Sequence, residues 1–270
     1  MATSALPAAP AAASSAAVSA LASETPASPS ASSSGAAGGD AEVRTVLHDA
    51  QNFNVKHPLY NTWTLWFDNP SAKGTSAAKG GKDSWGEEMN KVVSFDSVEE
   101  FWGLYNNIIP PSELPQKANY YLFKEGIQPA WEDAANTNGG KWSIQLPREK
   151  SRADIDRLWL NTMLSAIGET LESPYDSSSP AASNTAEAIT GIIMSARPNL
   201  YRIAIWTRTA DESASGELDP ALLNIGKHFK VGILGYQLNQ QVGGGGMQSD
   251  VEFQSHKDSE RKGKGRKFVV

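Results

Sequence analysis

The uneven placement of aromatic residues along the chain constrains its fold more than any other feature. No Phe, Tyr or Trp precedes Phe53, and the first 40 residues are almost entirely Ala, Ser, Pro and Gly. Such a segment cannot bury enough apolar surface to offset the entropy that it would lose on ordering. We therefore expect residues 1–45 to form a disordered tail and residues 46–270 to form one folded domain.

Composition excludes several classes of protein. The chain has no cysteine, which rules out disulfides, thiolate metal sites and thiol nucleophiles. Its net charge of −6 argues against a protein that coats nucleic acid through the phosphates, although recognition of one small feature of an RNA stays open. We find no secretory signal and no stretch long enough to span a membrane. A cytoplasmic location is expected, and a nuclear pool is equally compatible.

Apolar periodicity predicts the order of strands and helices. Strands are expected at residues 63–67, 90–94, 120–124, 141–146, 189–195, 201–208, 233–237 and 267–270. Helices are expected from the capping-box pattern Ser97-Val-Glu-Glu100 to Pro110-Pro111, over residues 153–167, and from Asp219-Pro220 to Gly232. Strands outnumber helices and tight turns join several of them, which indicates an α+β fold with an antiparallel sheet and helices on one face.

One strand carries a pattern that suits a ligand site. Within residues 201–208, side chains that alternate along the strand share one face of the sheet, and on one face these are Arg202, Ala204, Trp206 and Arg208. Two cations and an aromatic ring fit an anionic ligand that also has a flat ring. The alternative is a solvated face with a partly buried tryptophan.

Two further tryptophans lack an obvious packing role. Trp131 lies beside Glu132 and Asp133 at the start of a polar, glycine-rich loop. Trp85 stands alone in a polar stretch. Most tryptophans pack in a core, so each by itself is weak evidence for stacking on a ligand.

Short blocks with a fixed order carry a family resemblance. They are His57-Pro-Leu59 followed by Trp63 and Trp66, Val98-Glu-Glu-Phe-Trp102, Leu122-Phe-Lys-Glu-Gly-Ile127, Trp131-Glu-Asp133, Gly139-Gly140-Lys-Trp142, Ile167-Gly-Glu169 and Ile203-Ala-Ile-Trp206. These blocks resemble the eukaryotic translation initiation factor 4E family, and tryptophan at both 63 and 85 resembles its main class. The resemblance implies a curved antiparallel β-sheet with three helices packed on the convex face and a slot for the mRNA cap on the concave face.

The resemblance also implies which residues bind the cap. The methylated guanine would stack between Trp85 and Trp131, Glu132 would accept hydrogen bonds from the base, and Trp206 would lie against the N7 methyl group. The basic residues that would bind the phosphates are Arg197, Arg202 and Lys141. Methylation at N7 makes the base a cation, so two indole faces would each contribute about 1–2 kcal/mol and the carboxylate about 1.5–3 kcal/mol.

A second implied surface binds protein partners. It comprises His57, Pro58, Val98, Trp102, Leu160 and Leu164. In the family this surface takes an amphipathic helix from the scaffold factor 4G or from competing 4E-binding repressors, in the helix-in-groove mode. From its helical spacing alone, Trp102 would be an ordinary core residue.

Other functions remain as alternatives. An enzyme acting on caps or nucleotides would need a metal cluster, a phosphate-binding glycine loop or a nucleophile motif, and the four histidines are scattered. We therefore expect that the protein is not an enzyme, that it has no catalytic residue, and that it binds no cofactor or metal. A family repressor with a weak cap slot is the closest alternative to an active initiation factor. A domain whose tryptophans are all core residues is the third.

Overall fold

The computed structural model describes residues 44–49, 51–69, 89–176, 187–212, 216–243, 248–260 and 265–270. These residues belong to one compact unit, Val43–Val270. Almost all of the predicted tail lies outside the described residues, as does Trp85.

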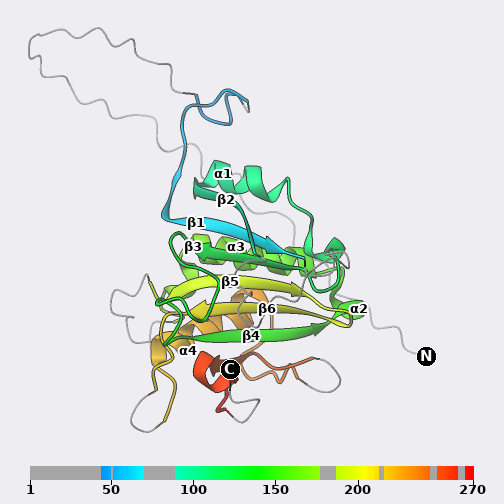
Figure 1. The fold of residues 1–270 in the computed structure, drawn as a ribbon, viewed down its shortest axis with the longest axis vertical. Coiled ribbons are helices and arrows are strands. Elements are labelled where there is room, and N and C mark those ends of the chain that lie inside the picture. Colours follow the sequence, from blue (N-terminus) through cyan, green and yellow to red (C-terminus); the bar gives the residue numbers. More distant parts are fainter. Residues whose placement is uncertain are drawn as a thin grey trace, which may run out of the picture. The chain divides into compact units, whose positions relative to one another are not determined.

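The centre of the fold is an antiparallel sheet whose eight strands lie in the order β2-β1-β3-β5-β6-β4-β7-β8. Figure 1 shows the part of this order from β2 to β4. The strands are β1 Pro58–Asp68, β2 Asn90–Ser97, β3 Asn119–Lys124, β4 Gly140–Pro147, β5 Ile189–Ala196, β6 Leu200–Thr207, β7 Glu252–Ser255 and β8 Phe268–Val269. The strands predicted at residues 189–195 and 201–208 are present as β5 and β6, which pair as a hairpin with Ala196 opposite Tyr201.

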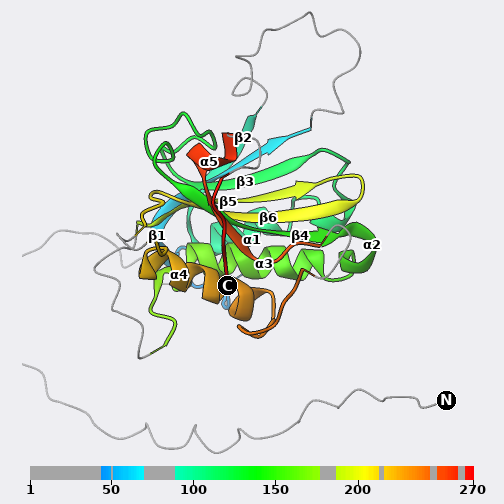
Figure 2. The same cartoon turned by 90° about the horizontal axis from the view of Figure 1, so that it is seen from below.

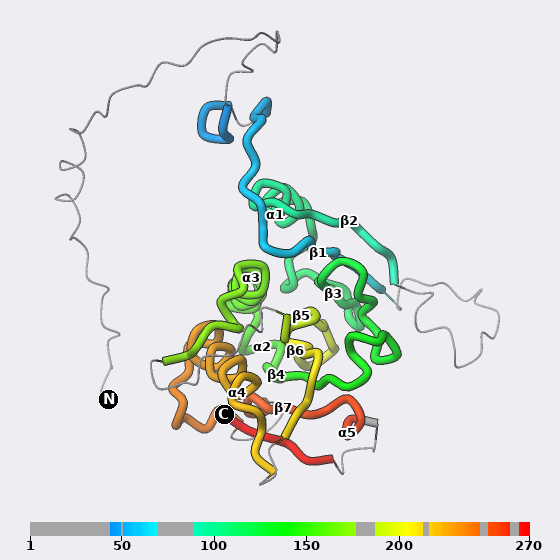
Figure 3. Tube along the Cα trace, turned by 90° about the vertical axis from the view of Figure 1, so that its left-hand side faces the viewer, coloured from blue at the N-terminus to red at the C-terminus, as the bar shows by residue number. Residues whose placement is uncertain are grey.

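Three helices cover one face of the curved sheet, as Figure 2 shows from below. They are α1 Val98–Tyr105, α3 Ile155–Ile167 and α4 Pro220–Lys227. Figure 3 shows α3 and α4 along the same side of β4, β5 and β6. Shorter helical segments are α2 Arg148–Ser151, α5 His256–Glu260, η2 Pro111–Glu113, η3 Thr170–Glu172 and η4 His228–Ile233. The predicted α+β fold is confirmed.

The alternation along β4 explains how the sheet separates a core from a working face. Trp142, Ile144 and Leu146 are buried in the main core beneath the helices, while the intervening residues are half-buried on the opposite face. The indole N–H of Trp142 donates to the carbonyl of Leu222 in α4 at 2.8 Å, which fixes helix and sheet together. Because side chains alternate across a strand, this packing also fixes which residues face the concave side.

Helix starts follow the sequence signals with one difference. Asp219 caps α4 as predicted, because its carboxylate accepts the N–H of Ala221 at 2.8 Å. Ser97 precedes α1, but its side chain makes no cap bond. Glu100 instead accepts the backbone N–H of Asp96, the residue before the N-cap, at 3.1 Å, so the reciprocal bonds of a capping box do not form.

The predicted strand at residues 233–237 is wrong. Gly232 does not end the third helix, since α4 continues into the π-helical turn η4 as far as Ile233. Lys230 in this turn is buried, and its ammonium donates to the carbonyl oxygens of Leu238 (3.0 Å) and Val270. A buried ammonium needs such acceptors, so the following chain curls around Lys230 and does not extend as a strand.

No helix among the described residues is long and apolar enough to cross a membrane.

Candidate functional site

A small aromatic cluster forms the floor of the concave face. Tyr121 and Phe123 from β3 pack with Ala204 and Trp206 from β6, on the side of the sheet opposite the main core. The Phe123 and Trp206 rings meet edge to face at 5.6 Å between centroids. A Cβ on Gly191 of β5 would lie 2.3 Å from the Phe123 ring, so only glycine lets this ring lie across the sheet. Trp206 is thereby fixed, with 9% of its surface exposed.

A buried histidine packs against Trp206. The His256 ring, from the first residue of α5, lies 4.2 Å from the Trp206 ring, and the residue is 3% exposed. Burial, with the charge of Lys141, lowers the pKa of His256 to about 4, so the imidazole is neutral at pH 7. Sequence reasoning missed His256 because no local pattern marks a contact between α5 and the distant strand β6.

Three basic residues lie along β4, β6 and the β5–β6 turn, and Lys141 is directly opposite Trp206 where β4 pairs with β6. Arg202 and Lys141 face the concave side from β6 and β4, and Arg197 lies in the turn between β5 and β6. Burial, and then the charge of Arg197, lowers the pKa of Arg202. Burial likewise lowers the pKa of Lys141, followed by the charges of Arg202 and Lys267. The structure therefore brings the three predicted phosphate-binding residues together.

The charge of this group is not neutralised within the described part of the chain. None of Arg197, Arg202 and Lys141 forms an ion pair there with a carboxylate. Burial and neighbouring positive charge lower the pKa of Arg202 and of Lys141, so an arriving anion would relieve both the repulsion and the desolvation. Arg208, which the strand pattern placed on the same face, donates from Nε to the carbonyl of Glu187 at 3.1 Å.

A long loop between β3 and β4 carries Trp131 and Glu132. Trp131 is 41% exposed, and its indole N–H donates to the Glu132 carboxylate at 2.7 Å. Both side chains are therefore accessible, with the flat ring and the carboxylate next to each other. Trp85, the predicted second stacking ring, lies outside the described residues, so the structure shows one wall of the predicted slot.

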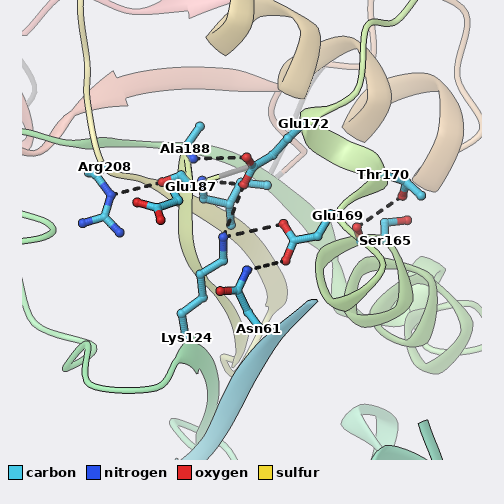
Figure 4. Close-up of polar contacts among 10 residues, drawn as sticks. Asn61, Lys124, Ser165, Glu169, Thr170, Glu172, Glu187, Ala188 and Arg208 are labelled. Carbon is cyan, nitrogen blue, oxygen red and sulfur yellow. Dashed lines mark hydrogen bonds and ion pairs between the residues drawn. The ribbon is translucent and has the colours of Figure 1, made fainter. Parts of the chain in front are cut away.

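The loop starts at a buried charge cluster (Figure 4). Lys124, the last residue of β3, points its ammonium at the carboxylates of Glu169 and Glu172, each 3.6 Å away. Glu169 also accepts from the Asn61 side chain at 2.8 Å, and Glu172 accepts the backbone N–H of Ile189 at 2.9 Å. The cluster joins β1, β3, β5 and the end of the α3 region, so the stem of the loop is firmly held.

The loop ends in an equally tight contact. A Cβ on Gly139 would lie 1.8 Å from the carbonyl oxygen of Thr207 in β6, so the close approach requires glycine. The N–H of Gly140 then donates to the Thr207 hydroxyl at 3.2 Å, and the N–H of His256 donates to the Gly139 carbonyl at 2.9 Å. Both ends of the loop are therefore fixed to the sheet that carries Trp206.

The residues of the predicted partner surface lie on the helical side. Val98 and Trp102 on α1 and Leu164 on α3 are 38%, 37% and 37% exposed, so all three present apolar surface to solvent on these two helices. Leu160, also on α3, is partly buried. The helical spacing suggested a core position for Trp102, but more than a third of it reaches solvent.

His57 and Pro58 are joined directly to α1. The His57 Nδ1 lies 2.6 Å from the Glu99 carboxylate, and the His57 backbone N–H donates to the same group at 2.9 Å. The His57 carbonyl in turn accepts the N–H of Val98 at 2.9 Å. The bonds from His57 lower the pKa of Glu99 to about 2. The chain entering β1 and the start of α1 therefore form one surface.

The concave face thus defines a receptor for a ligand that combines a flat ring with negative charge. Residues 58–268 match the family described as eukaryotic initiation factor 4E. The chain belongs to the eukaryotic initiation factor 4E family.

Relatives with this family name are similar in sequence to most of the chain. It is 38% identical over 224 residues to eukaryotic translation initiation factor 4E-1 of Schizosaccharomyces pombe, covering 83% of this chain and 86% of the relative. It is 42% identical over 190 residues to eukaryotic translation initiation factor 4E of Saccharomyces cerevisiae, covering 70% and 76%.

Solved structures share the fold. The complex of Ascaris suum eIF4E-3 with m7G cap aligns with a TM-score of 0.60 and 29% identity, covering 80% of this chain and 98% of that one. The complex of Caenorhabditis elegans eIF4E-3 with the 4E-binding protein Mextli aligns with a TM-score of 0.58 and 28% identity, covering 78% and 98%.

Proposed function

We propose that the protein binds the 7-methylguanosine cap of mRNA on its concave face and recruits the scaffold factor 4G to start cap-dependent translation in the cytoplasm. The observation that carries the proposal is the set of three half-buried cations Arg197, Arg202 and Lys141, which form no ion pair with a carboxylate among the described residues; Lys141 lies opposite Trp206. A triphosphate next to a stacked base matches this charge. The related structure of Ascaris suum eIF4E-3 was solved with m7G cap, and the Mextli complex contains a 4E-binding protein.

The base would be recognised through its positive charge. N7 methylation leaves guanine with a delocalised positive charge, which is attracted to indole faces by about 1–2 kcal/mol per desolvated face. Trp131 supplies one face, and we assign the other to Trp85. Glu132 would exchange its bond with the Trp131 indole for hydrogen bonds from the base, which are stronger because both partners are charged. Trp206 would lie against the methyl group.

The phosphates would lie along β6 and β4. Arg202 and Arg197 have planar guanidinium groups that match pairs of phosphate oxygens, and Lys141 adds a point charge beside them. Because binding an anion relieves repulsion that already exists in the free protein, these contacts would favour any nucleoside triphosphate. Selectivity for the methylated base must therefore come from the Trp131 and Glu132 side of the site.

The partner surface would take an amphipathic helix. Val98, Trp102 and Leu164 expose apolar surface on α1 and α3, with Leu160, His57 and Pro58 completing the set. An exposed tryptophan in such a surface is the kind of residue that dominates binding energy at interfaces. We assign this surface to the scaffold factor 4G and to 4E-binding repressors that compete for it.

We predict that the protein is a binding factor and not an enzyme. Incubation with cap analogue and magnesium should release no nucleotide, and release at a catalytic rate would contradict the proposal.

Quenching of tryptophan fluorescence on titration with m7GTP and with GTP tests the proposal. The methylated nucleotide should bind more than about 100-fold more tightly, since it gains two stacking contributions and stronger hydrogen bonds. Equal affinity for the two nucleotides would refute cap recognition.

A further inference from the structure

The loop from Glu125 to Gly139 carries both Trp131 and Glu132 but contains no helix or strand. Such a segment has no ladder of backbone hydrogen bonds to hold its shape. Ordering it only when ligand arrives would weaken binding, since each fixed residue loses conformational entropy. Its hydrogen bonds are therefore informative, because they show what holds the two contact residues in place before binding.

One fully buried side chain bridges the two arms of this loop. Asn136 has 0% exposure, and its amide nitrogen donates to the carbonyl oxygens of Gln128 at 2.9 Å and Ala130 at 2.8 Å. Both amide protons of Asn136 are thus used on carbonyls that precede Trp131. Burial strengthens the constraint, because either carbonyl would lose its partner if the chain moved away.

Asp133 closes the same loop from the other side. Its carboxylate accepts the backbone N–H of Gln128 at 2.9 Å and of Ala135 at 2.8 Å. Its carbonyl accepts the backbone N–H of Asn136 at 2.9 Å and the hydroxyl of Thr137 at 2.9 Å. Hydrogen bonds therefore anchor the residue before Trp131, which is Ala130, and the residue after Glu132, which is Asp133.

We propose that Asn136 is the positioning residue of the cap slot, acting through the backbone of Trp131 and Glu132. By tying Gln128 and Ala130 to the far arm of the loop, it holds the indole and the carboxylate at the mouth of the site before any ligand binds. Asp133 supports the same geometry. The inference rests on the proposed function, since it explains how the ring and carboxylate that read the methylated base are placed.

The consequence should be specific to the base. Displacing Trp131 and Glu132 weakens stacking and the base hydrogen bonds, whereas Arg197, Arg202 and Lys141 on the sheet stay where they are. Loss of the anchor should therefore reduce the preference for m7GTP over GTP more than it reduces binding of GTP. A residue that only stabilises the fold would not change this ratio in the population that remains folded.

The test compares two substitutions of the same chemistry in the same loop. Asn136→Asp removes both amide donors, while Asn138→Asp adds the same charge at an exposed asparagine whose side chain accepts from Lys257 at 2.9 Å. Each variant is titrated with m7GTP and with GTP by tryptophan fluorescence, and its folded fraction is measured by thermal unfolding. Asn136→Asp should weaken m7GTP binding by about 10- to 50-fold and lower the m7GTP preference. Asn138→Asp should keep the preference of the wild type.

Asp133→Ala provides a second test if Asn136→Asp does not fold. Asp133 is half-buried, and alanine removes the two carboxylate bonds without burying a charge. It should lower the preference for m7GTP in the same direction. An unchanged preference in the folded variant, or an equal loss in Asn138→Asp, would overturn the role of the anchor. Absence of any preference in the wild type would overturn the proposed function itself.

Discussion

The contact between His256 and Trp206 should make the stability of the protein depend on pH in a defined window. His256 is 3% exposed, and its pKa falls from 6.5 to about 4 on folding. Above about pH 7.5 the histidine is almost entirely neutral in both the folded and the unfolded chain, so it adds no pH dependence there. As the pH falls from about 7.5 toward 4, the unfolded chain binds a proton that the folded protein excludes, and stability is lost.

The size of this loss follows from the difference between the two pKa values. A drop from 6.5 to about 4 corresponds to about 3 kcal/mol in total, at about 1.4 kcal/mol per pKa unit. Most of it, roughly 2–3 kcal/mol, should appear between pH 7.5 and pH 4.5. Screening by water reduces such values at exposed sites, but it has little effect on a side chain that is almost fully buried.

The perturbation is His256→Leu, which removes the titrating group and leaves an apolar side chain against Trp206. Urea unfolding, followed by circular dichroism at several pH values, gives the free energy of unfolding of both proteins. The difference between wild type and variant should shift by roughly 2–3 kcal/mol, in favour of the variant, as the pH falls from 7.5 to 4.5. His48→Leu, which removes an exposed histidine, is measured in parallel. If His256→Leu and wild type lose stability in step across this range, the buried neutral histidine is refuted.

Three further predictions concern binding. Glu132→Gln should weaken m7GTP binding by about 10- to 100-fold and GTP binding much less, because a charged acceptor is lost from the base; equal losses for both nucleotides in fluorescence titrations would contradict this. Trp102→Ala should bind a 4E-binding peptide at least about 10-fold more weakly while m7GTP affinity stays within about twofold. Unchanged peptide affinity by calorimetry would remove Trp102 from the partner surface. Arg202→Met should weaken m7GTP and GTP alike by about 10-fold and reduce the salt dependence of binding, without lowering the melting temperature. A salt dependence equal to that of wild type would argue against a phosphate contact.

The sequence by itself determined the elements whose cause is local. Apolar periodicity predicted the strand at residues 141–146, which is β4, and Asp219-Pro220 predicted the start of α4. The same periodicity also predicted the strands at 189–195 and 201–208, which a short turn places side by side as a hairpin. These signals lie within a few residues of one another, so no knowledge of distant chain is needed to interpret them.

Tertiary structure decided what distant segments do to one another. Residues 233–237 have an apolar pattern that suits a strand. The buried Lys230, however, donates hydrogen bonds to the carbonyl oxygens of Leu238 and Val270, and these bonds hold the region as a helical turn and a loop. An isolated sequence cannot show that a lysine will be buried, since burial depends on what packs over it. The same holds for His256, which gains its role only when α5 folds back over β6.

In the candidate site, too, some features were predictable from the sequence and others only from the tertiary structure. The type of each contact residue was visible in the sequence and in its resemblance to a family, so Trp131, Glu132 and the basic residues could be named in advance. The two hydrogen bonds that the Asn136 side-chain amide donates across the loop could not be predicted, because a polar asparagine in a glycine-rich stretch is expected to face water. Folding buries it, and burial turns an ordinary side chain into the bridge that holds the loop together.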